Sequence, residues 1–280
     1  MNGAFAYHQP ARLADALAVL AGGRHRVLAG GTDYYPACVG RLVEDDIVDI
    51  TRLPELRGIS HDGAAVRIGA AATWRDIIEA DLPPCFNGLK AAAREVGGLQ
   101  IQNAGTVAGN LCNASPAADG VPPLMALDAE VELASARGVR RVRLTDFILG
   151  SRRTVRAADE LVLAVHVPAW PARARGAFCK LGHRRYLVIS IVMVAATVAL
   201  DADGAIERCA IAVGACSAVA MRLPMLEARL PGMPAAEAAA GICAADLAPL
   251  APIDDIRGSA TYRQEAALVL VRQALLQAVA

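Results

Sequence analysis

The chain has 280 residues, of which 55% are hydrophobic and 20% charged, and its 28 basic side chains equal its 28 acidic ones. This composition excludes a disordered chain, and the balanced charge gives no broad attraction toward nucleic acid. The length suits one large domain or two ordinary ones, and a neutral, apolar-rich surface favours burial against partner subunits.

The first part of the chain alternates helix and strand patterns around a glycine-rich loop. Apolar residues at helical spacing predict a helix over 10–21, which ends at Gly22-Gly23. A strand at 26–28 then enters the loop Ala29-Gly30-Gly31-Thr32-Asp33. Residues 47–50 predict a further short strand.

The middle of the chain contains a second glycine-rich loop. Alternation over 59–68 predicts a small sheet, and Thr73 begins a helix. Residues 89–96 predict another helix, which leads to the loop Thr106-Val107-Ala108-Gly109-Asn110. A turn-rich run follows and reaches the carboxylate of Asp119.

The segment after this loop is mostly strand. A helix begins at Val121, and strands follow at 131–133 and 139–144 with Gly138 at the turn between them. Residues 160–167 predict another strand. Helices and strands mix without a repeat of fixed period, which is an α+β pattern.

Two prolines interrupt secondary structure in Pro168-Ala169-Trp170-Pro171-Ala172, so we expect a domain boundary there. Beyond it, apolar runs at 187–200 and 206–215 predict an antiparallel hairpin around the turn Asp201-Ala202-Asp203-Gly204. Helices are predicted at the chain's end, at 235–245 and 264–279.

No targeting or membrane-spanning segment is expected. The most hydrophobic run, 186–200, is shorter than the roughly 20 residues that cross a bilayer, which favours a buried strand. The first eight residues lack the basic and long apolar regions of a signal peptide. The cytoplasm is therefore the expected location.

Both glycine-rich loops offer what a diphosphate needs. Glycine lets the main chain bring several N–H groups close to an anion, and the neighbouring threonines and Asn110 add donors. The first loop is neither the three-glycine dinucleotide fingerprint nor a phosphate loop ending in Gly-Lys-Ser/Thr. An isolated glycine pair is more often a simple tight turn, whereas two such loops favour a nucleotide.

Three segments in order resemble the FAD-binding medium subunit of the molybdenum hydroxylases, a family that includes carbon monoxide dehydrogenase, xanthine dehydrogenase and 4-hydroxybenzoyl-CoA reductase. They are residues 29–33, Gln100 to Leu127, and the run Phe178-Cys179-Lys180-Leu181-Gly182-His183-Arg184-Arg185-Tyr186-Leu187-Val188-Ile189-Ser190. The resemblance covers nearly the whole chain. It implies an FAD-dependent oxidoreductase subunit.

The resemblance also implies a fold and its division. Residues 1–170 would form a two-subdomain FAD-binding domain of the vanillyl-alcohol-oxidase/PCMH type, with subdomains at about 1–55 and 56–170. Residues 171–280 would form a smaller C-terminal α+β domain of the CO dehydrogenase flavoprotein type, with an antiparallel sheet plus helices.

Site residues follow from the same resemblance. The two loops would embrace the FAD pyrophosphate, Asp119 would hold sugar or ribityl hydroxyls, and Lys180 would stabilise the anionic reduced flavin. Tyr186 is either a shield for the flavin ring or a core tyrosine. The expected cofactor-binding residues are Leu28, Ala29, Gly30, Gly31, Thr32, Asp33, Val96, Thr106, Ala108, Gly109, Asn110, Asp119, Val162, Lys180 and Tyr186.

Three residues depart from the family pattern. Ala108 replaces a glycine, Gln102 stands where relatives often carry Arg, and Val188 stands where many carry Asp. These changes leave flavin affinity and acceptor choice open. A self-sufficient FAD-dependent oxidase or reductase, and a scaffold subunit with a decayed site, are therefore the alternative functions.

The seven cysteines show no Cys-x-x-Cys motif and no histidine pair that would complete a metal site. Cys112 is expected to be a buried structural thiol. The resemblance therefore implies that iron-sulfur clusters lie on a small partner subunit and the molybdenum cofactor on a large one, with NAD, quinone or oxygen as acceptor. No catalytic residue is assigned. Arginines in 137–143 and 152–156 either dock an acidic partner or form a solvated strand face.

Overall fold

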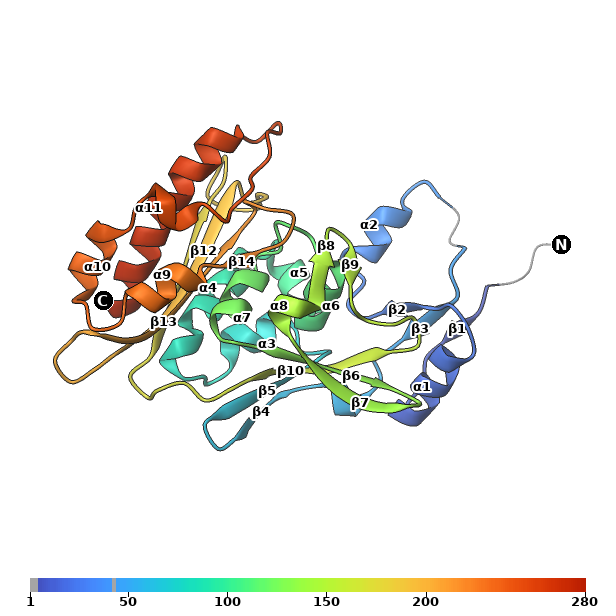
Figure 1. Cartoon of the computed structure of the whole chain (residues 1–280). Coiled ribbons are helices and arrows are strands. Elements are labelled where there is room, and N and C mark those ends of the chain that lie inside the picture. Colours follow the sequence, from blue (N-terminus) through green and yellow to red (C-terminus); the bar gives the residue numbers. More distant parts are fainter. Residues whose placement is uncertain (1–4, 42–43) are drawn as a thin grey trace.

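The computed structural model describes residues 5–41 and 44–280, and the strands of this part of the chain form four sheets. A small parallel sheet lies nearest the N-terminus, in the order β1-β3-β2 (Figure 1). Its strands are β1 (Tyr7–His8), β2 (Arg26–Leu28) and β3 (Ile47–Asp49), with helices α1 (Leu13–Ala21) and α2 (Tyr34–Cys38). The predicted helix and both predicted strands are confirmed.

Asp49 stabilises this small sheet through hydrogen bonds. Its carboxylate accepts hydrogen bonds from Tyr7 Oη at 2.5 Å, Gln9 Nε2 at 2.7 Å and the Thr51 N–H at 2.8 Å. Although burial opposes the shift, these donors lower the pKa of Asp49, and the Asp49 contact raises the pKa of Tyr7 to about 12. The sheet that leads into the first glycine-rich loop is thus held by a carboxylate with three hydrogen-bond donors.

A five-stranded antiparallel sheet follows, in the order β4-β5-β10-β6-β7. Its strands are β4 (Ile59–Asp62), β5 (Ala65–Gly69), β6 (Glu130–Ser135), β7 (Gly138–Arg143) and β10 (Leu161–Val167). Each predicted strand of this region is present, and Gly138, with φ of +130°, starts β7 at the predicted turn. A short hairpin, β8 (Ile148–Gly150) with β9 (Arg153–Thr154), lies beside it.

Short helices occupy the chain between β5 and β8. They are α3 (Trp74–Glu79), α4 (Asn87–Glu95), α5 (Leu99–Ala104), α6 (Val107–Asn113), α7 (Val121–Ala126) and α8 (Leu144–Phe147), with the 3-10 turn η2 (Pro84–Phe86). A further 3-10 turn, η1 (Pro54–Leu56), precedes β4. Thr73 caps α3 as predicted, in a capping box with Asp76. The second glycine-rich loop is helical, because Thr106 caps α6, which extends to Asn113. The turn-rich run expected after this loop therefore begins at Ala114 and reaches Asp119 through turns.

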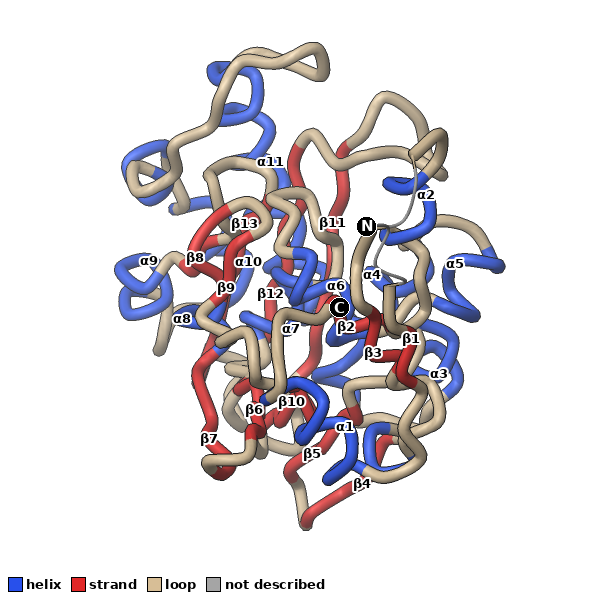
Figure 2. The backbone as a smooth tube through the Cα atoms, turned by 90° about the vertical axis from the view of Figure 1, so that its right-hand side faces the viewer, coloured by secondary structure: helices blue, strands red, loops and turns tan. Residues whose placement is uncertain are grey.

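The C-terminal part is a four-stranded antiparallel sheet in the order β11-β12-β13-β14, covered by a long helix. The strands are β11 (Arg175–Leu181), β12 (Val192–Leu200), β13 (Ile206–Gly214) and β14 (Met221–Arg222), and the helices are α9 (Pro224–Arg229), α10 (Ala235–Gly241), η3 (Ala244–Leu247) and α11 (Ala260–Val279). In Figure 1, α11 lies at the left and the small sheet β1-β3-β2 at the right, and in Figure 2 α11 lies toward the top and β4 at the bottom.

The predicted hairpin around residues 201–204 is confirmed, but its first strand begins at Val192 instead of residue 187. Leu187 has φ of +51°, a left-handed conformation that ends regular strand geometry. β11 was not predicted at all. The final predicted helix is present and begins earlier, at Ala260, where Ser259 caps it.

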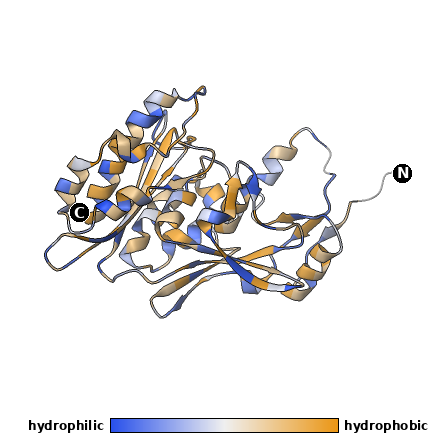
Figure 3. Ribbon diagram, in the orientation of Figure 1, coloured by the Kyte–Doolittle hydropathy of each residue, from blue (hydrophilic) through white to orange (hydrophobic). Residues whose placement is uncertain are grey.

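Two hydrophobic cores meet across β12. Ala195 and Ala199 face a core shared with the first part of the chain, whereas Val194 and Val198 face the core beneath α11. Figure 3 shows β12 and β13 as mostly hydrophobic. Within 5–41 and 44–280, no helix combines the length and apolar character that crossing a bilayer requires.

Polar contacts join the two parts. Arg208 and Arg222, from β13 and β14, each donate to Asp128 at 2.7 Å. The Arg208 guanidinium also lies 3.9 Å from the ring centroid of Trp170, whose Nε1 donates to the Leu127 carbonyl at 3.2 Å. The linker that carries Trp170 is therefore held against both parts of the chain.

Candidate functional site

The two glycine-rich loops lie against each other. A Cβ built on Gly30 would lie 1.6 Å from the carbonyl oxygen of Ala104, so only glycine permits this backbone contact. A Cβ on Gly105 would lie 3.3 Å from Thr32 Oγ1. The loop after β2 and the loop before α6 therefore form one continuous surface, named here the loop cradle (residues 29–33 and 104–110).

The loop cradle presents main-chain donors and an unused acceptor. The N–H groups of Gly30, Gly31 and Thr32 donate no hydrogen bond to any described residue. Gly31 has φ of +68°, the left-handed conformation that lets consecutive N–H groups converge. Asn110 Oδ1 is buried and has no partner within the described part of the chain. These groups fit a ligand that carries phosphates and hydroxyls.

Asp119 connects the loop cradle to the C-terminal sheet. A Cβ on the adjacent Gly120 would lie 2.2 Å from the Trp74 ring and 2.9 Å from Asn110 Oδ1. Asp119 is therefore close in space to the second loop. Its carboxylate accepts from Lys180 Nζ at 2.6 Å and from Ser190 Oγ at 2.7 Å.

This ion pair is buried, with the Lys180 side chain 7% exposed and that of Asp119 11% exposed. Burial raises the pKa of Asp119 above its ordinary value, and the Lys180 ammonium and the Ser190 hydroxyl oppose that rise. A carboxylate has about four lone-pair positions, so two remain for a ligand's hydroxyl groups.

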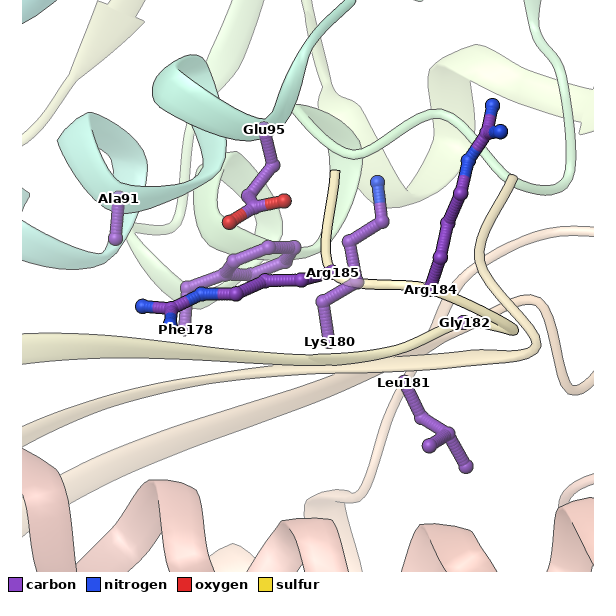
Figure 4. A pocket seen from close by; sticks show the side chains of 8 residues that line it. All are labelled: Ala91, Glu95, Phe178, Lys180, Leu181, Gly182, Arg184 and Arg185. Carbon is purple, nitrogen blue, oxygen red and sulfur yellow. The ribbon is translucent and has the colours of Figure 1, made fainter. Parts of the chain in front are cut away.

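A cavity of about 400 Å³ opens beside Lys180. Figure 4 shows Glu95 extending from the end of α4 toward β11, and Lys180 and Leu181 leaving opposite faces of β11. The residues that line this cavity are Ala91, Glu95, Phe178, Lys180, Leu181, Gly182, Arg184 and Arg185. A polar rim around an aromatic side chain suits a flat heteroaromatic ring.

The other expected site residues lie around these features. Leu28 ends β2, Ala108 is buried in the first turn of α6, and Val96 follows the last residue of α4. Val162 is 3% exposed and packs in the core of the first part of the chain. Tyr186 is 59% exposed, which rules out the core-tyrosine interpretation.

Two of the three residues that differ from the family pattern, Gln102 and Val188, have structural roles. Gln102 is buried and donates from Nε2 to the Arg94 carbonyl at 3.1 Å, which satisfies the end of α4. Val188 is half-buried, and a Cβ on Gly182 would lie 2.6 Å from its side chain. Gln102 therefore contacts the residue before Glu95, and Val188 lies beside Gly182.

Arg152 is a site residue that the sequence analysis missed. From the turn between β8 and β9 it forms an ion pair with Asp33 at 2.6 Å and contacts Asn113. Three other arginines of the expected basic patch are likewise paired: Arg137 with Asp159, Arg140 with Glu160 and Arg141 with Glu132. Arg143 and Arg153 are exposed and form no ion pair with the described residues.

Glu95 was also missed, although its position carried a signal. It ends α4, where the helix dipole disfavours a negative charge, so an acidic residue there indicates a local role. Cys112, which was expected to be buried, is half-buried, and desolvation of its thiol raises its pKa. Within the described ranges, no group of three or more His, Cys, Asp or Glu side chains is arranged to hold a metal ion.

Comparison with known proteins places this geometry in a family. The model of the FAD binding domain in molybdopterin dehydrogenase matches residues 3–170, and that of the CO dehydrogenase flavoprotein C-terminal domain matches residues 177–278. The xanthine dehydrogenase FAD-binding subunit of Escherichia coli O157:H7 is 33% identical over 98% of this chain and 96% of its own. The carbon monoxide dehydrogenase medium chain of Hydrogenophaga pseudoflava is 30% identical over 97% and 96%.

Solved structures agree. Carbon monoxide dehydrogenase from Hydrogenophaga pseudoflava superposes with a TM-score of 0.89 at 29% identity, covering 99% of this chain and 98% of that one. Quinoline 2-oxidoreductase from Pseudomonas putida 86 gives 0.88 at 30% identity, covering 99% and 97%. The chain therefore belongs to the family of FAD-binding medium subunits of the molybdopterin-dependent dehydrogenases.

Proposed function

We propose that this chain is the flavin electron-transfer subunit of a multisubunit molybdenum hydroxylase. Relatives that are named as a medium chain or an FAD-binding subunit support this role. The main structural support for this role is the contact between the two glycine-rich loops, next to the buried Asp119–Lys180 ion pair. FAD, when bound, supplies an isoalloxazine ring that accepts and releases electrons.

The residues of the site divide the work of holding that cofactor. The loop cradle, with its free N–H groups, would bind the pyrophosphate, and Asp119 would accept from sugar or ribityl hydroxyls. Lys180 would place its ammonium group near the ring, where positive charge favours the reduced anion. Leu28, Val96, Val162 and the exposed Tyr186 would complete the lining.

The proposed partners follow from the same role. A small iron-sulfur subunit delivers electrons, a large subunit with the molybdenum cofactor oxidises the substrate, and NAD, a quinone or oxygen accepts the electrons. The proposed domains are 1–170, with subdomains at about 1–55 and 56–170, and 171–280. The proposed location is the cytoplasm.

The visible spectrum of the purified chain, before and after FAD is added, tests the site. Gly30→Ala should weaken FAD binding at least about tenfold, because its methyl group forces the two loops apart. Gly23→Ala is the matched control, since its Cβ would approach only His25, at 3.6 Å. Equal affinity in the two variants would contradict the site.

Two alternatives give different results in the same preparation. A scaffold subunit with a decayed site would carry no flavin even when purified with its partners. A self-sufficient oxidase or reductase would bind FAD and turn over substrate without iron-sulfur and molybdenum subunits. Co-purification of those two subunits with a flavin-loaded chain is the outcome expected here.

A further inference from the structure

The segment that follows β11, residues 182–190, forms few hydrogen bonds with the rest of the chain. Within the described residues, no main-chain hydrogen bond joins residues 182–190 to any other segment. His183, Arg184, Arg185, Tyr186 and Leu187 are all exposed, and Arg184 donates to the Leu187 carbonyl inside the loop itself. Something other than the backbone must therefore hold this segment in place.

One carboxylate from the other domain holds both ends of the segment. Lys180, just before it, donates to Asp119 Oδ2, and Ser190, its last residue, donates to Asp119 Oδ1. Ser190 is 2% exposed, so water does not compete for this hydrogen bond. We name the three residues Asp119, Lys180 and Ser190 the carboxylate clasp.

A buried arginine fixes the chain next to Ser190. Arg263 of α11 donates from Nη1 to the carbonyls of Ile191 at 2.6 Å and Ala215 at 2.9 Å, and from Nη2 to Asp255 at 2.7 Å. The backbone at residue 191 is therefore immobilised, and the Ser190 hydroxyl is presented to Asp119 from a rigid support.

The position of the segment matters because it forms one wall of the cavity. Gly182, Arg184 and Arg185 line the cavity opposite Glu95. We propose that Ser190 is a positioning residue: together with Lys180 it allows Asp119 to hold residues 181–189 against the flavin cavity, which sets where Tyr186 stands relative to the ring. The part that concerns the ring rests on the proposed function, whereas the clasp can be tested without FAD.

Trypsin gives the direct test, because Arg184 and Arg185 place two cleavage sites in the middle of the segment. With the full chain lacking FAD, Ser190→Ala should increase the cleavage rate after these arginines about tenfold, the effect expected from losing a hydrogen bond to a carboxylate. Ser190→Thr keeps the hydroxyl and should restore cleavage to near the original rate. Unfolding temperatures, measured in parallel, confirm that each variant is folded.

Ser135→Ala is the matched control. Ser135 is also buried and its hydroxyl also forms a hydrogen bond, accepting from the Arg137 N–H at 3.2 Å, but it lies on β6 away from the segment. It should leave cleavage after Arg184 and Arg185 unchanged. If the original chain is cut there as fast as in urea, or if Ser190→Ala is cut no faster, the clasp does not hold the segment.

A second readout concerns the flavin. FAD-loaded Ser190→Ala should retain its absorption bands but show stronger quenching of flavin fluorescence by iodide, because the loosened segment exposes the ring, and Ser190→Thr should reverse the change. A chain that protects the segment from trypsin but never binds FAD would overturn the proposed function and leave the clasp intact. Unchanged quenching in Ser190→Ala would show that the segment does not cover the ring.

Discussion

Lys180 and Asp119 are 61 residues apart in the sequence, yet they form a buried ion pair at the junction of the two domains. A buried charge pair is costly to bring out of water, so it contributes more to specificity of position than to stability. Its ammonium group is the one positive charge of the cavity wall that is itself buried, among the residues described. The burial of this charge favours an electrostatic role for Lys180 toward a ligand in the cavity.

Lys180→Met should lower the midpoint potential of bound FAD by roughly 30 mV, which for a two-electron couple equals about 1.4 kcal/mol of lost stabilisation of the reduced ring. Spectroelectrochemical titration of the FAD-loaded chain measures it. Lys90→Met removes the only other lysine in the sequence, which lies on α4 outside the cavity lining, and should leave the potential unchanged. A shift of equal size in both variants would indicate a general charge effect.

At the residue scale, part of the candidate site could be predicted from the sequence. The glycines and Asp119 could be found because they form local motifs that resemble a known family. Ser190 and Arg152 could not, because their partners lie 71 and 119 residues away. Neither a serine in an apolar run nor an arginine in a basic run differs locally from a residue without such a partner.

At the scale of elements, strands with strong alternation were predicted and β11 was not. Gly176 and Ala177 weaken its strand pattern, and their small size is explained only by the fold. A Cβ on Gly176 would lie 2.2 Å from the Cys85 carbonyl, and one on Gly88 would lie 2.8 Å from that of Ala177. The approach of α4 to β11 thus depends on residues that look unfavourable for either element.

The five-stranded sheet contains an ion pair whose pH dependence can be derived. Hydrogen bonds from Arg140 lower the pKa of Glu160 below its ordinary value of 4.5, although burial opposes the shift. A carboxylate with a lowered pKa stabilises the folded chain above its ordinary pKa, and this contribution is lost as pH falls through the folded-state value. Acid should therefore weaken the edge of the sheet.

Glu160→Gln should lower the free energy of unfolding at pH 7 by about 1–3 kcal/mol, because Arg140 and the Ala157 N–H lose a charged acceptor. The difference from the original chain should shrink toward pH 4. Urea unfolding at several pH values measures both. Glu79→Gln, which breaks only the exposed Arg75–Glu79 pair on α3, should change stability by less than about 0.5 kcal/mol.

At the scale of the whole molecule, Arg222 couples the two cores. It donates to Asp128 Oδ1 and the Met125 carbonyl in one domain, and to both oxygens of Glu227 in the other. Replacing Arg222 leaves Asp128 and Glu227 without its guanidinium. The small side chains of Ala195 and Ala199 on β12 already bring the C-terminal sheet close to the first part of the chain.

Arg222→Met should therefore destabilise the chain by about 3 kcal/mol and divide thermal unfolding into two transitions. Differential scanning calorimetry shows both effects. Arg229→Met is the control, because Arg229 pairs with Asp246 inside the C-terminal domain alone, at 2.7 Å. A single sharp transition in Arg222→Met would mean that apolar packing is sufficient to couple the domains.

The two tryptophans of the chain lie at the loop cradle and at the junction of the two domains. Trp74 packs beside Gly105 and Gly120 at the loop cradle, and Trp170 lies under Arg208 where the domains join. Indole emission responds to polarity and to nearby acceptors of excitation energy. The chain thus contains one native optical probe for events at the cradle and another for separation of the domains, and Trp74→Phe or Trp170→Phe isolates either signal without any attached dye.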